Sequence, residues 1–181
     1  MNPDIERILY TEEQIADKVK KIAKQIDDEY AGKNPLILCI LKGSLIFTAD
    51  LLRALEIPAD VEFIQISSYG CSACPGELIV KKDVDVAIAD RHVIVVEDIL
   101  DTGTTLSYIV NLLHQRNPAS VKICAMFSKP SRRRESIQAD FIGYDVPDEF
   151  VVGYGLDYAE SYRGLPYLGV LKRSVYKHAS E

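Results

Sequence analysis

The chain has 181 residues, with 21 basic and 27 acidic side chains and a formal net charge of −6. This length predicts one domain over residues 1–181, and the acidic balance argues against a general nucleic-acid-binding protein. No apolar run is long enough to span a membrane, and the first residues lack the apolar core of a signal peptide. We therefore expect a cytoplasmic protein with no membrane partner.

The first part of the chain predicts a helix, a strand and a second helix. Thr11 caps a helix that Gly32 ends. A buried strand follows over residues 36–41, and Lys42 and Gly43 lead from it into the next helix. Because glycine lets backbone approach a ligand and lysine adds charge, this turn is a candidate anion site. The alternative is a plain tight turn with a solvated lysine.

A loop rich in Gly, Pro and Ser separates two further predicted strands, residues 61–67 and 77–84. A long loop between strands, here residues 68–76, predicts a lid over a site.

The four cysteines do not predict a metal or redox centre. Cys71 and Cys74 have suitable spacing, but a zinc site needs a second pair, and Pro75 follows where a redox helix would begin. We interpret them as incidental loop thiols, and a redox role stays open. Cys39 and Cys124 lie in apolar runs and are predicted core residues.

The stretch around residues 93–106 has the most specific chemistry. Residues 93–96 are typical of a parallel strand buried on both faces, and Glu97 and Asp98 stand where this strand is predicted to end. Asp101 and a Gly/Thr-rich turn then lead into a helix. Backbone N–H groups and hydroxyls at a helix start suit a phosphate.

Three carboxylates beside a phosphate site would repel the phosphate unless they bind something else. Ribose hydroxyls, or a Mg²⁺ shared with the phosphates, would remove this conflict. The turn therefore favours a phosphorylated ribose. The alternative is that the acids only cap the helix, although one cap needs one acid.

The rest of the chain predicts a strand over residues 121–127 and short strands over residues 141–144, 150–154 and 167–171. A basic run, residues 132–134, is interpreted as a solvated face or an oligomer contact. Alternating strands, turns and helices predict the α/β class, with a mostly parallel central sheet flanked by helices.

Functional-looking residues recur at the predicted strand ends, and they form five motifs in sequence order. These are Leu41-Lys42-Gly43, Ser68-Tyr69, Val95-Val96-Glu97-Asp98-Ile99-Leu100-Asp101-Thr102-Gly103-Thr104-Thr105, Phe127-Ser128-Lys129 and the run from Phe150 to Tyr158. With Tyr162-Arg163, they make the chain resemble the hypoxanthine-guanine phosphoribosyltransferases of bacterial type, within the type I phosphoribosyltransferases. The resemblance covers roughly residues 8–171.

The resemblance implies a glycosyltransferase (pentosyltransferase) of purine salvage, with a small hood region formed by the chain ends. Such an enzyme transfers 5-phosphoribosyl from 5-phosphoribosyl 1-pyrophosphate to hypoxanthine or guanine, requires Mg²⁺ and forms a homodimer or homotetramer. The order of preference among hypoxanthine, guanine and xanthine does not follow from side-chain identity.

The resemblance also implies roles for the residues around the ribose phosphate. Asp101 matches the general acid/base, and it forms the 5′-phosphate cradle together with Thr102, Gly103, Thr104 and Thr105. Many relatives have lysine at position 104, so the effect of this threonine stays open.

Other matches concern the ribose, the metal and the pyrophosphate. Glu97 and Asp98 match the ribose and metal ligands. Lys42 and Gly43, preceded by a cis peptide bond, match the pyrophosphate loop, to which Arg163 adds a second contact.

The purine side and the lid are matched in the same way. Lys129 matches the donor to the exocyclic oxygen of the purine, Phe150 the ring that stacks on the base, and Val151 a source of backbone contacts. Asp157 matches a metal and pyrophosphate ligand that also lies at the purine. Ser68 and Tyr69 match the lid loop. A core position is the alternative for Phe150.

Two rival functions stay open at this point. One is a nucleotide- and RNA-binding regulator on the same fold, which the acidic balance and the intact Asp101, Lys129 and Asp157 disfavour. The other is a dehydrogenase-like nucleotide-binding protein, which the absence of Gly-x-Gly-x-x-Gly after the first strand disfavours.

Overall fold

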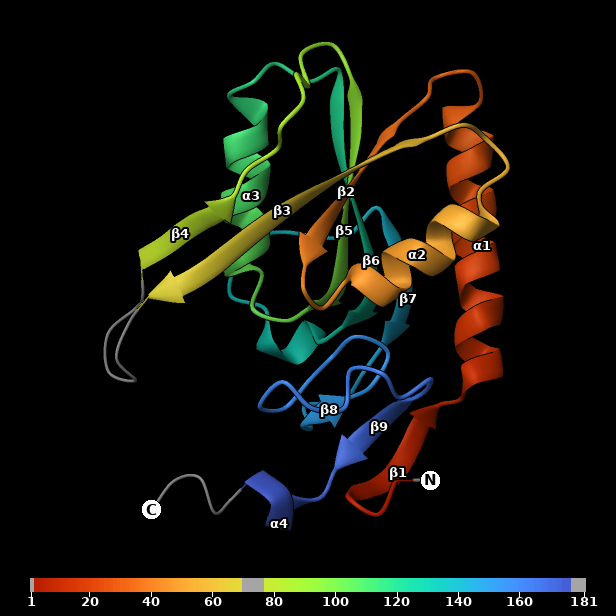
Figure 1. Ribbon diagram of the computed structural model, residues 1–181, viewed down its shortest axis with the longest axis vertical. Coiled ribbons are helices and arrows are strands. Elements are labelled where there is room, and N and C mark those ends of the chain that lie inside the picture. The colour runs from red at the N-terminus through yellow and green to blue at the C-terminus, as the bar shows by residue number, and fades with distance from the viewer. Residues whose placement is uncertain (1, 70–76, 177–181) are drawn as a thin grey trace.

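The computed structural model describes residues 2–69 and 77–176 (Figure 1). Its strands form two sheets, a large one with the order β4-β3-β2-β5-β6-β7 and a small one with the order β1-β9-β8. The elements are β1 (Ile5–Tyr10), α1 (Glu12–Tyr30), β2 (Leu36–Leu41), α2 (Leu45–Ala54), β3 (Asp60–Tyr69), β4 (Glu77–Lys82), β5 (His92–Leu100), α3 (Thr104–His114), β6 (Ser120–Ser128), β7 (Phe141–Asp145), β8 (Val151–Val152), β9 (Leu168–Leu171) and α4 (Arg173–Tyr176).

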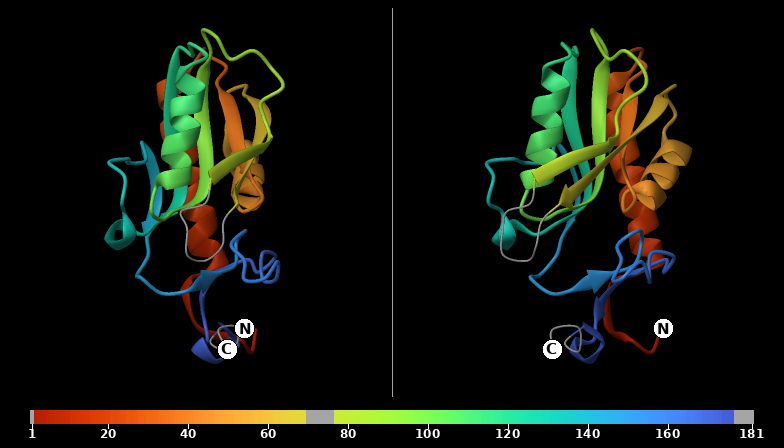
Figure 2. Two further views of the ribbon diagram at one scale, coloured as in Figure 1. Left: turned by 90° about the vertical axis from the view of Figure 1, so that its left-hand side faces the viewer. Right: turned by 60° about the vertical axis from the view of Figure 1, so that its left-hand side comes forward.

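The large sheet is parallel except for its edge strand β4. Successive side chains of a strand point to opposite faces, so β2 and β5 supply both sides of the core. Ile37 and Ile94 pack with α1 and α2, whereas Leu38 and Val95 pack on the other face with α3. The helices thus flank the sheet on both faces (Figure 2), and the predicted fold class is confirmed.

Helix α1 forms as its sequence predicts. Thr11 and Gln14 make a reciprocal capping box, with Gln14 N donating to Thr11 Oγ1 at 3.3 Å and Thr11 N donating to Gln14 Oε1 at 2.9 Å. The apolar face from Ile15 to Tyr30 is buried against the large sheet.

The small sheet is a hood made from both ends of the chain. Strand β1 pairs antiparallel with β9, and β9 pairs antiparallel with β8. Sequence analysis did not predict β1, because its Glu6 and Arg7 are exposed and interrupt the apolar pattern. Figure 1 shows the hood below the large sheet, next to the end where β5 enters the loop to α3.

Strands β5 and β8 differ most from their predicted boundaries. Strand β5 does not end at Glu97 and Asp98 but runs on to Leu100, because its ladder with β6 continues to the Leu100–Ser128 pair. Strand β8 is shorter than predicted, since Gly153 takes a φ of +100° and turns the chain away.

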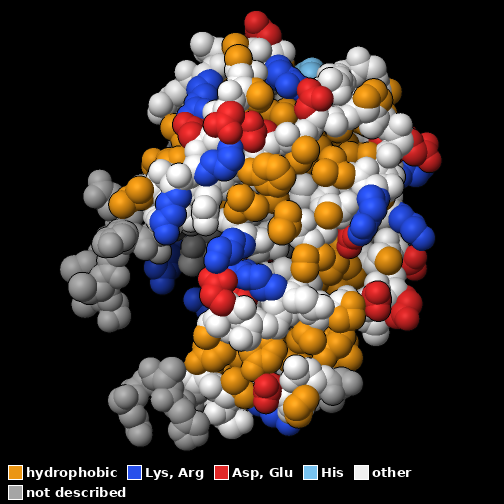
Figure 3. All heavy atoms as spheres, in the orientation of Figure 1, with side chains coloured by type: hydrophobic (Ala, Val, Ile, Leu, Met, Phe, Trp, Pro, Cys, Tyr) orange, Lys and Arg blue, Asp and Glu red, His pale blue; other side chains and the backbone are white. Residues whose placement is uncertain are grey.

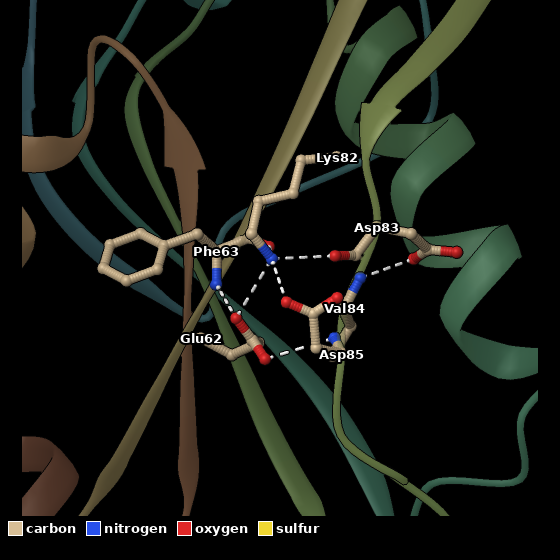
Figure 4. Close-up of polar contacts among 6 residues, drawn as sticks. All are labelled: Glu62, Phe63, Lys82, Asp83, Val84 and Asp85. Carbon is tan, nitrogen blue, oxygen red and sulfur yellow. Dashed lines mark hydrogen bonds and ion pairs between the residues drawn. The ribbon is translucent and has the colours of Figure 1, made fainter.

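The antiparallel edge of the large sheet is anchored by a buried carboxylate (Figure 4). Glu62 of β3 accepts hydrogen bonds from the backbone N–H groups of Phe63 (2.8 Å) and Asp85 (3.1 Å) and pairs with Lys82 Nζ at 3.3 Å. These hydrogen bonds lower the pKa of Glu62. The network fixes the base of the β3–β4 arm, whose far end carries Ser68 and Tyr69.

None of the helices that the structure describes is both long enough and apolar enough to cross a membrane.

Candidate active site

The predicted site residues come from the ends of β2, β5 and β6 and from the hood. Parallel strands bring their carboxyl ends to one edge of a sheet, where ligands of open α/β sheets bind. A larger cleft, of about 660 Å³, lies between α1, α2 and residues 164–166, and none of the predicted site residues lines it. The candidate site is therefore the sheet edge and not this cleft.

The turn after β2 lies against the acidic pair of β5. The peptide bond between Leu41 and Lys42 is cis, as the resemblance implies. A Cβ atom on Gly43 would stand 1.7 Å from Asp98 Oδ2, and one on Gly155 would stand 2.0 Å from the carbonyl oxygen of Gly43. Only glycine fits at these two close approaches. The turn after β2 therefore packs directly against β5 on one side and against the hood segment after β8 on the other.

Arg163, in the segment between β8 and β9, lies beside the Gly155 backbone that approaches Gly43. Its Nη1 donates to the carbonyl oxygen of Gly155 at 2.8 Å, and its Nη2 lies 2.8 Å from Asp157 Oδ1. Glu160 accepts from Lys42 Nζ at 3.1 Å, and its backbone N–H donates to Asp157 Oδ2 at 2.9 Å. The side chains of Lys42 and Arg163 are thus paired with the acids Glu160 and Asp157 beside the Gly43 backbone. Sequence analysis did not predict the part that Glu160 plays.

Glu97 and Asp98 are adjacent carboxylates, and the pKa of each is raised. Burial raises the pKa of Glu97 well above its usual value, and the adjacent charge of Asp98 raises it further. Burial also raises the pKa of Asp98, which is 8% exposed. Part of Glu97 is exposed, yet its Oε2 is buried and has no hydrogen-bond partner among the described residues. Such a pair is suited to bind hydroxyl groups or a cation.

Replacing Glu97 by glutamine is expected to stabilise the metal-free protein increasingly as pH rises. A raised folded-state pKa means that the folded protein binds the proton more tightly than the unfolded chain. Ionisation therefore lowers the free energy of unfolding above the ordinary glutamate pKa of about 4.3. Thermal unfolding between about pH 5 and 8 measures this effect, since Glu97→Gln removes the loss. A difference in Tm that does not change with pH would contradict it.

The end of β5 and the turn that follows it line a small cavity at the start of α3. It has a volume of about 90 Å³, and its lining residues come from the acidic strand end and the following turn: Glu97, Ile99, Leu100, Asp101, Thr102, Gly103, Thr105 and Leu106. Gly103 has a φ of +86°, and a Cβ there would stand 2.6 Å from Ile137 Cγ2. Thr104 is exposed and does not line the cavity. The cavity suits a small anion at a helix start.

Asp101 has an arginine partner that sequence analysis missed. Arg132 Nε lies 3.0 Å from Asp101 Oδ1, and Arg132 Nη1 lies 3.4 Å from Asp148 Oδ1. Arg133, the next residue, turns inward and donates to the carbonyl oxygen of Leu100. The interpretation of this basic run as a solvated face is therefore wrong for Arg133, which is half-buried, whereas Arg132 and Arg134 are exposed. Three like charges in a row do not indicate which side chain points inward.

Lys129 and Phe150 are the candidates for the other wall of the site. Lys129 is 6% exposed, and burial lowers the pKa of its amine. Its Nζ donates to the carbonyl oxygen of Glu149 at 2.8 Å, which brings it beside Phe150. The Phe150 ring is 37% exposed. Val151, the next residue, is buried in β8.

Two tyrosines support the Phe150 ring. Tyr176 stacks on it at a centroid distance of 5.0 Å, and Tyr158 meets it edge-on at 5.5 Å. Sequence analysis did not predict either contact, because both depend on how the hood folds. An exposed aromatic ring that is held in place in this way is suited to stack on a planar ligand.

Some predicted residues cannot be placed. The backbone of Ser68 and Tyr69 ends β3, but their side chains lie outside the described residues, as do Cys71 and Cys74. Cys39 and Cys124 are buried core residues, as predicted.

Comparison with known proteins gives one consistent result. Residues 7–159 match the phosphoribosyl transferase domain family. The hypoxanthine-guanine phosphoribosyltransferase of Bacillus subtilis (strain 168) is 47% identical over 178 residues, which are 98% of this chain and 99% of that protein. That of Streptococcus thermophilus (strain CNRZ 1066) is 46% identical and covers 97% of this chain and 98% of its own length.

Solved structures agree with the sequence relatives. A hypoxanthine phosphoribosyltransferase from Staphylococcus aureus superposes with a TM-score of 0.92 at 42% identity, covering 96% of this chain and 95% of that one. The enzyme from Trypanosoma cruzi in complex with the product IMP superposes with a TM-score of 0.91 at 42% identity, covering 97% and 99%. Since the sequence, the fold and the strand-end site agree, the chain belongs to the phosphoribosyltransferase family, among its hypoxanthine-guanine phosphoribosyltransferases.

Proposed function

We propose that the protein transfers the 5-phosphoribosyl group of 5-phosphoribosyl 1-pyrophosphate to hypoxanthine and/or guanine, giving IMP or GMP and pyrophosphate. The observation that carries this proposal is the cavity at the start of α3, whose walls include both Glu97 and Asp101. An anion site, a ribose site and a candidate base thus adjoin one another. The relative from Trypanosoma cruzi binds IMP in this fold.

Each group of residues has a proposed task in the transfer. The turn from Asp101 to Thr105 binds the 5′-phosphate, with Gly103 and the helix N–H groups as donors. Lys42, Gly43 and Arg163 bind the leaving pyrophosphate. The Asp101 carboxylate takes the proton from the purine nitrogen as that nitrogen attacks the anomeric carbon.

The purine is held and selected by the other wall. Phe150 stacks on the base, and the Val151 backbone contacts its edge. Lys129 donates to the exocyclic oxygen of a 6-oxopurine, whereas the amino group of adenine would present donors to a donor. Asp157 holds Arg163 at 2.8 Å, and it is the proposed further contact to the metal and the pyrophosphate. Closure of the lid over the site stays a proposal for Ser68 and Tyr69.

Magnesium is the proposed cofactor, bound by Glu97 and Asp98 together with substrate oxygens. The buried Glu97 Oε2 without a partner and the raised pKa of this pair fit a divalent cation. The described residues contain no group of three or more His, Cys, Asp or Glu that could hold a metal. A cation that takes one or two carboxylates and completes its shell with phosphates and water is typical of Mg²⁺. When bound, it would neutralise charge on the pyrophosphate.

Removal of Mg²⁺ is expected to abolish turnover and to weaken binding of the ribosyl donor. The buried carboxylates would then repel the donor with no cation between them. Turnover after chelation and readdition of Mg²⁺, together with donor affinity by calorimetry, measures both effects. Equal donor affinity with and without Mg²⁺ would contradict this role of Glu97 and Asp98.

The function itself is tested by nucleotide formation from the ribosyl donor with Mg²⁺, offering hypoxanthine, guanine, xanthine and adenine separately. Turnover with hypoxanthine or guanine, and none with adenine, is the expected result. No turnover with any base would favour the regulator that binds nucleotide and RNA.

One view of the surface bears on that regulator. Basic and acidic side chains alternate on the face in Figure 3 and form no continuous basic stripe there. An RNA-binding face would gather positive charge, and the mixed charges of this face do not have that character. A cytoplasmic homodimer or homotetramer is the proposed assembly, on the strength of the resemblance.

A further inference from the structure

We propose that Arg133 is a positioning residue for the transfer reaction. Its guanidinium joins the ends of β5 and β6 and so fixes Asp101 relative to Lys129. The roles of these two residues rest on the proposed function, whereas the clamp itself is a structural feature.

The clamp consists of three hydrogen bonds from one side chain. Arg133 Nη2 donates to the carbonyl oxygen of Leu100 at 3.2 Å and to Ser128 Oγ at 3.0 Å. Arg133 Nη1 donates to the carbonyl oxygen of Ile137 at 3.3 Å. One guanidinium therefore reaches the last residue of β5, the last residue of β6 and the loop that follows.

The position of the clamp along the strands gives it a role in the site. Leu100 and Ser128 are the last paired residues of the β5–β6 ladder. The next residues are Asp101 and Lys129, the proposed base and the proposed reader of the purine. After the last ladder pair, Lys129 N donates a backbone hydrogen bond to the Leu100 carbonyl oxygen at 3.0 Å. This bond joins the segments that leave β5 and β6.

The segment that follows Arg133 braces the phosphate turn from outside. The backbone N–H groups of residues 134 and 135 donate to the carbonyl oxygen of Thr102 at 2.9 and 3.2 Å. Gly103 lies beside the Arg133 stem, since an added Cβ on this glycine would stand 3.4 Å from Arg133 Cδ. The same side chain therefore places its stem beside the phosphate turn and binds the two strand ends with its guanidinium.

An arginine at position 133 can make these three hydrogen bonds, whereas a lysine could not make them in the same geometry. Burial lowers the pKa of Arg133, and the nearby charges of Asp101 and Asp145 offset part of that effect. The guanidinium has donors in a fixed fork, which can reach several acceptors at once, whereas lysine offers a point charge.

Arg133→Met is the variant that tests the clamp, because methionine keeps an apolar stem against Gly103 and removes the guanidinium. We expect kcat to fall and the KM for hypoxanthine to rise together, lowering kcat/KM by about 10²-fold, since a small misplacement of reacting groups has an effect of this size. The KM for the ribosyl donor should change much less, because methionine keeps an apolar stem beside the 5′-phosphate turn and the pyrophosphate site lies at β2 and the hood.

Arg116→Met is the matched control. Arg116 is also half-buried, and its Nη2 donates a hydrogen bond to Asp83 Oδ2 at 2.6 Å, which the substitution removes. Arg116 lies beyond the other end of α3, away from the site. The Arg116→Met variant should retain wild-type kinetic constants. A merely structural role for Arg133 would lower the amount of active enzyme and leave both KM values unchanged. That result, or wild-type constants in Arg133→Met, would overturn the proposal.

Hydrogen exchange of the Lys129 amide tests the clamp without turnover. This amide is bonded to the Leu100 carbonyl that Arg133 also holds, so its protection should fall in Arg133→Met and not in Arg116→Met. Unchanged protection overturns the clamp, even if the wild-type protein transfers no purine. Lost protection in a protein without turnover would instead contradict the proposed function and leave the clamp supported.

Discussion

Replacing Asp101 by alanine is expected to lower kcat by about 10²–10⁴-fold, the usual contribution of a general acid/base. The carboxylate is the proposed acceptor for the purine proton, and it lines the same cavity as Thr102 and Gly103. The backbone donors of the phosphate turn remain in the variant, so affinity for the ribosyl donor should change far less than kcat. Steady-state kinetics with hypoxanthine and donor binding by calorimetry separate the two effects.

Asp148→Ala is the matched control for this experiment. Asp148 and Asp101 both pair with Arg132, at 3.4 and 3.0 Å, so each variant removes one acidic partner of the same arginine. Only the loss of Asp101 should affect the transfer step. Wild-type turnover in Asp101→Ala would refute the assignment of the base, and equal losses in the two variants would assign the effect to Arg132.

Much of the site could be predicted because it is local in sequence. Strand and turn chemistry place Lys42, Glu97, Asp101 and Lys129 at the ends of buried runs, and parallel strands bring such ends together. The family resemblance supplied the roles of Phe150 and of the hood residues. Neither required knowledge of a distant contact.

The contacts that could not be predicted are the ones between distant segments. Gly43 fits only because Asp98 and Gly155 approach it from two other elements. Tyr176 supports Phe150 from α4, and Arg133 returns to the ends of β5 and β6. Periodicity and spacing report the local conformation of a chain, and they carry no information on which charged side chain crosses to another strand.

Lys129 is expected to account for selection against adenine. A hydrogen bond to a charged group contributes about 1.5–3 kcal/mol, so Lys129→Ala should lower kcat/KM for hypoxanthine by about 10–100-fold. Adenine gains nothing from this donor, so the ratio of kcat/KM for hypoxanthine to that for adenine should fall by a similar factor. Kinetics with both bases measure the ratio.

The selectivity experiment has an internal control on β6, the strand that precedes Lys129. Lys122 of β6 is half-buried, whereas Lys129 is buried, and Lys122 pairs with Glu29 on the α1 side of the sheet. Lys122→Ala therefore removes a half-buried lysine from β6 without touching the purine wall, and it should leave the ratio unchanged. Lys129 is held in place by the Glu149 carbonyl, which fixes its amine beside Phe150 before the base arrives. If Lys129→Ala discriminated against adenine as well as the wild-type protein does, selection would have to come from backbone groups near Val151 instead.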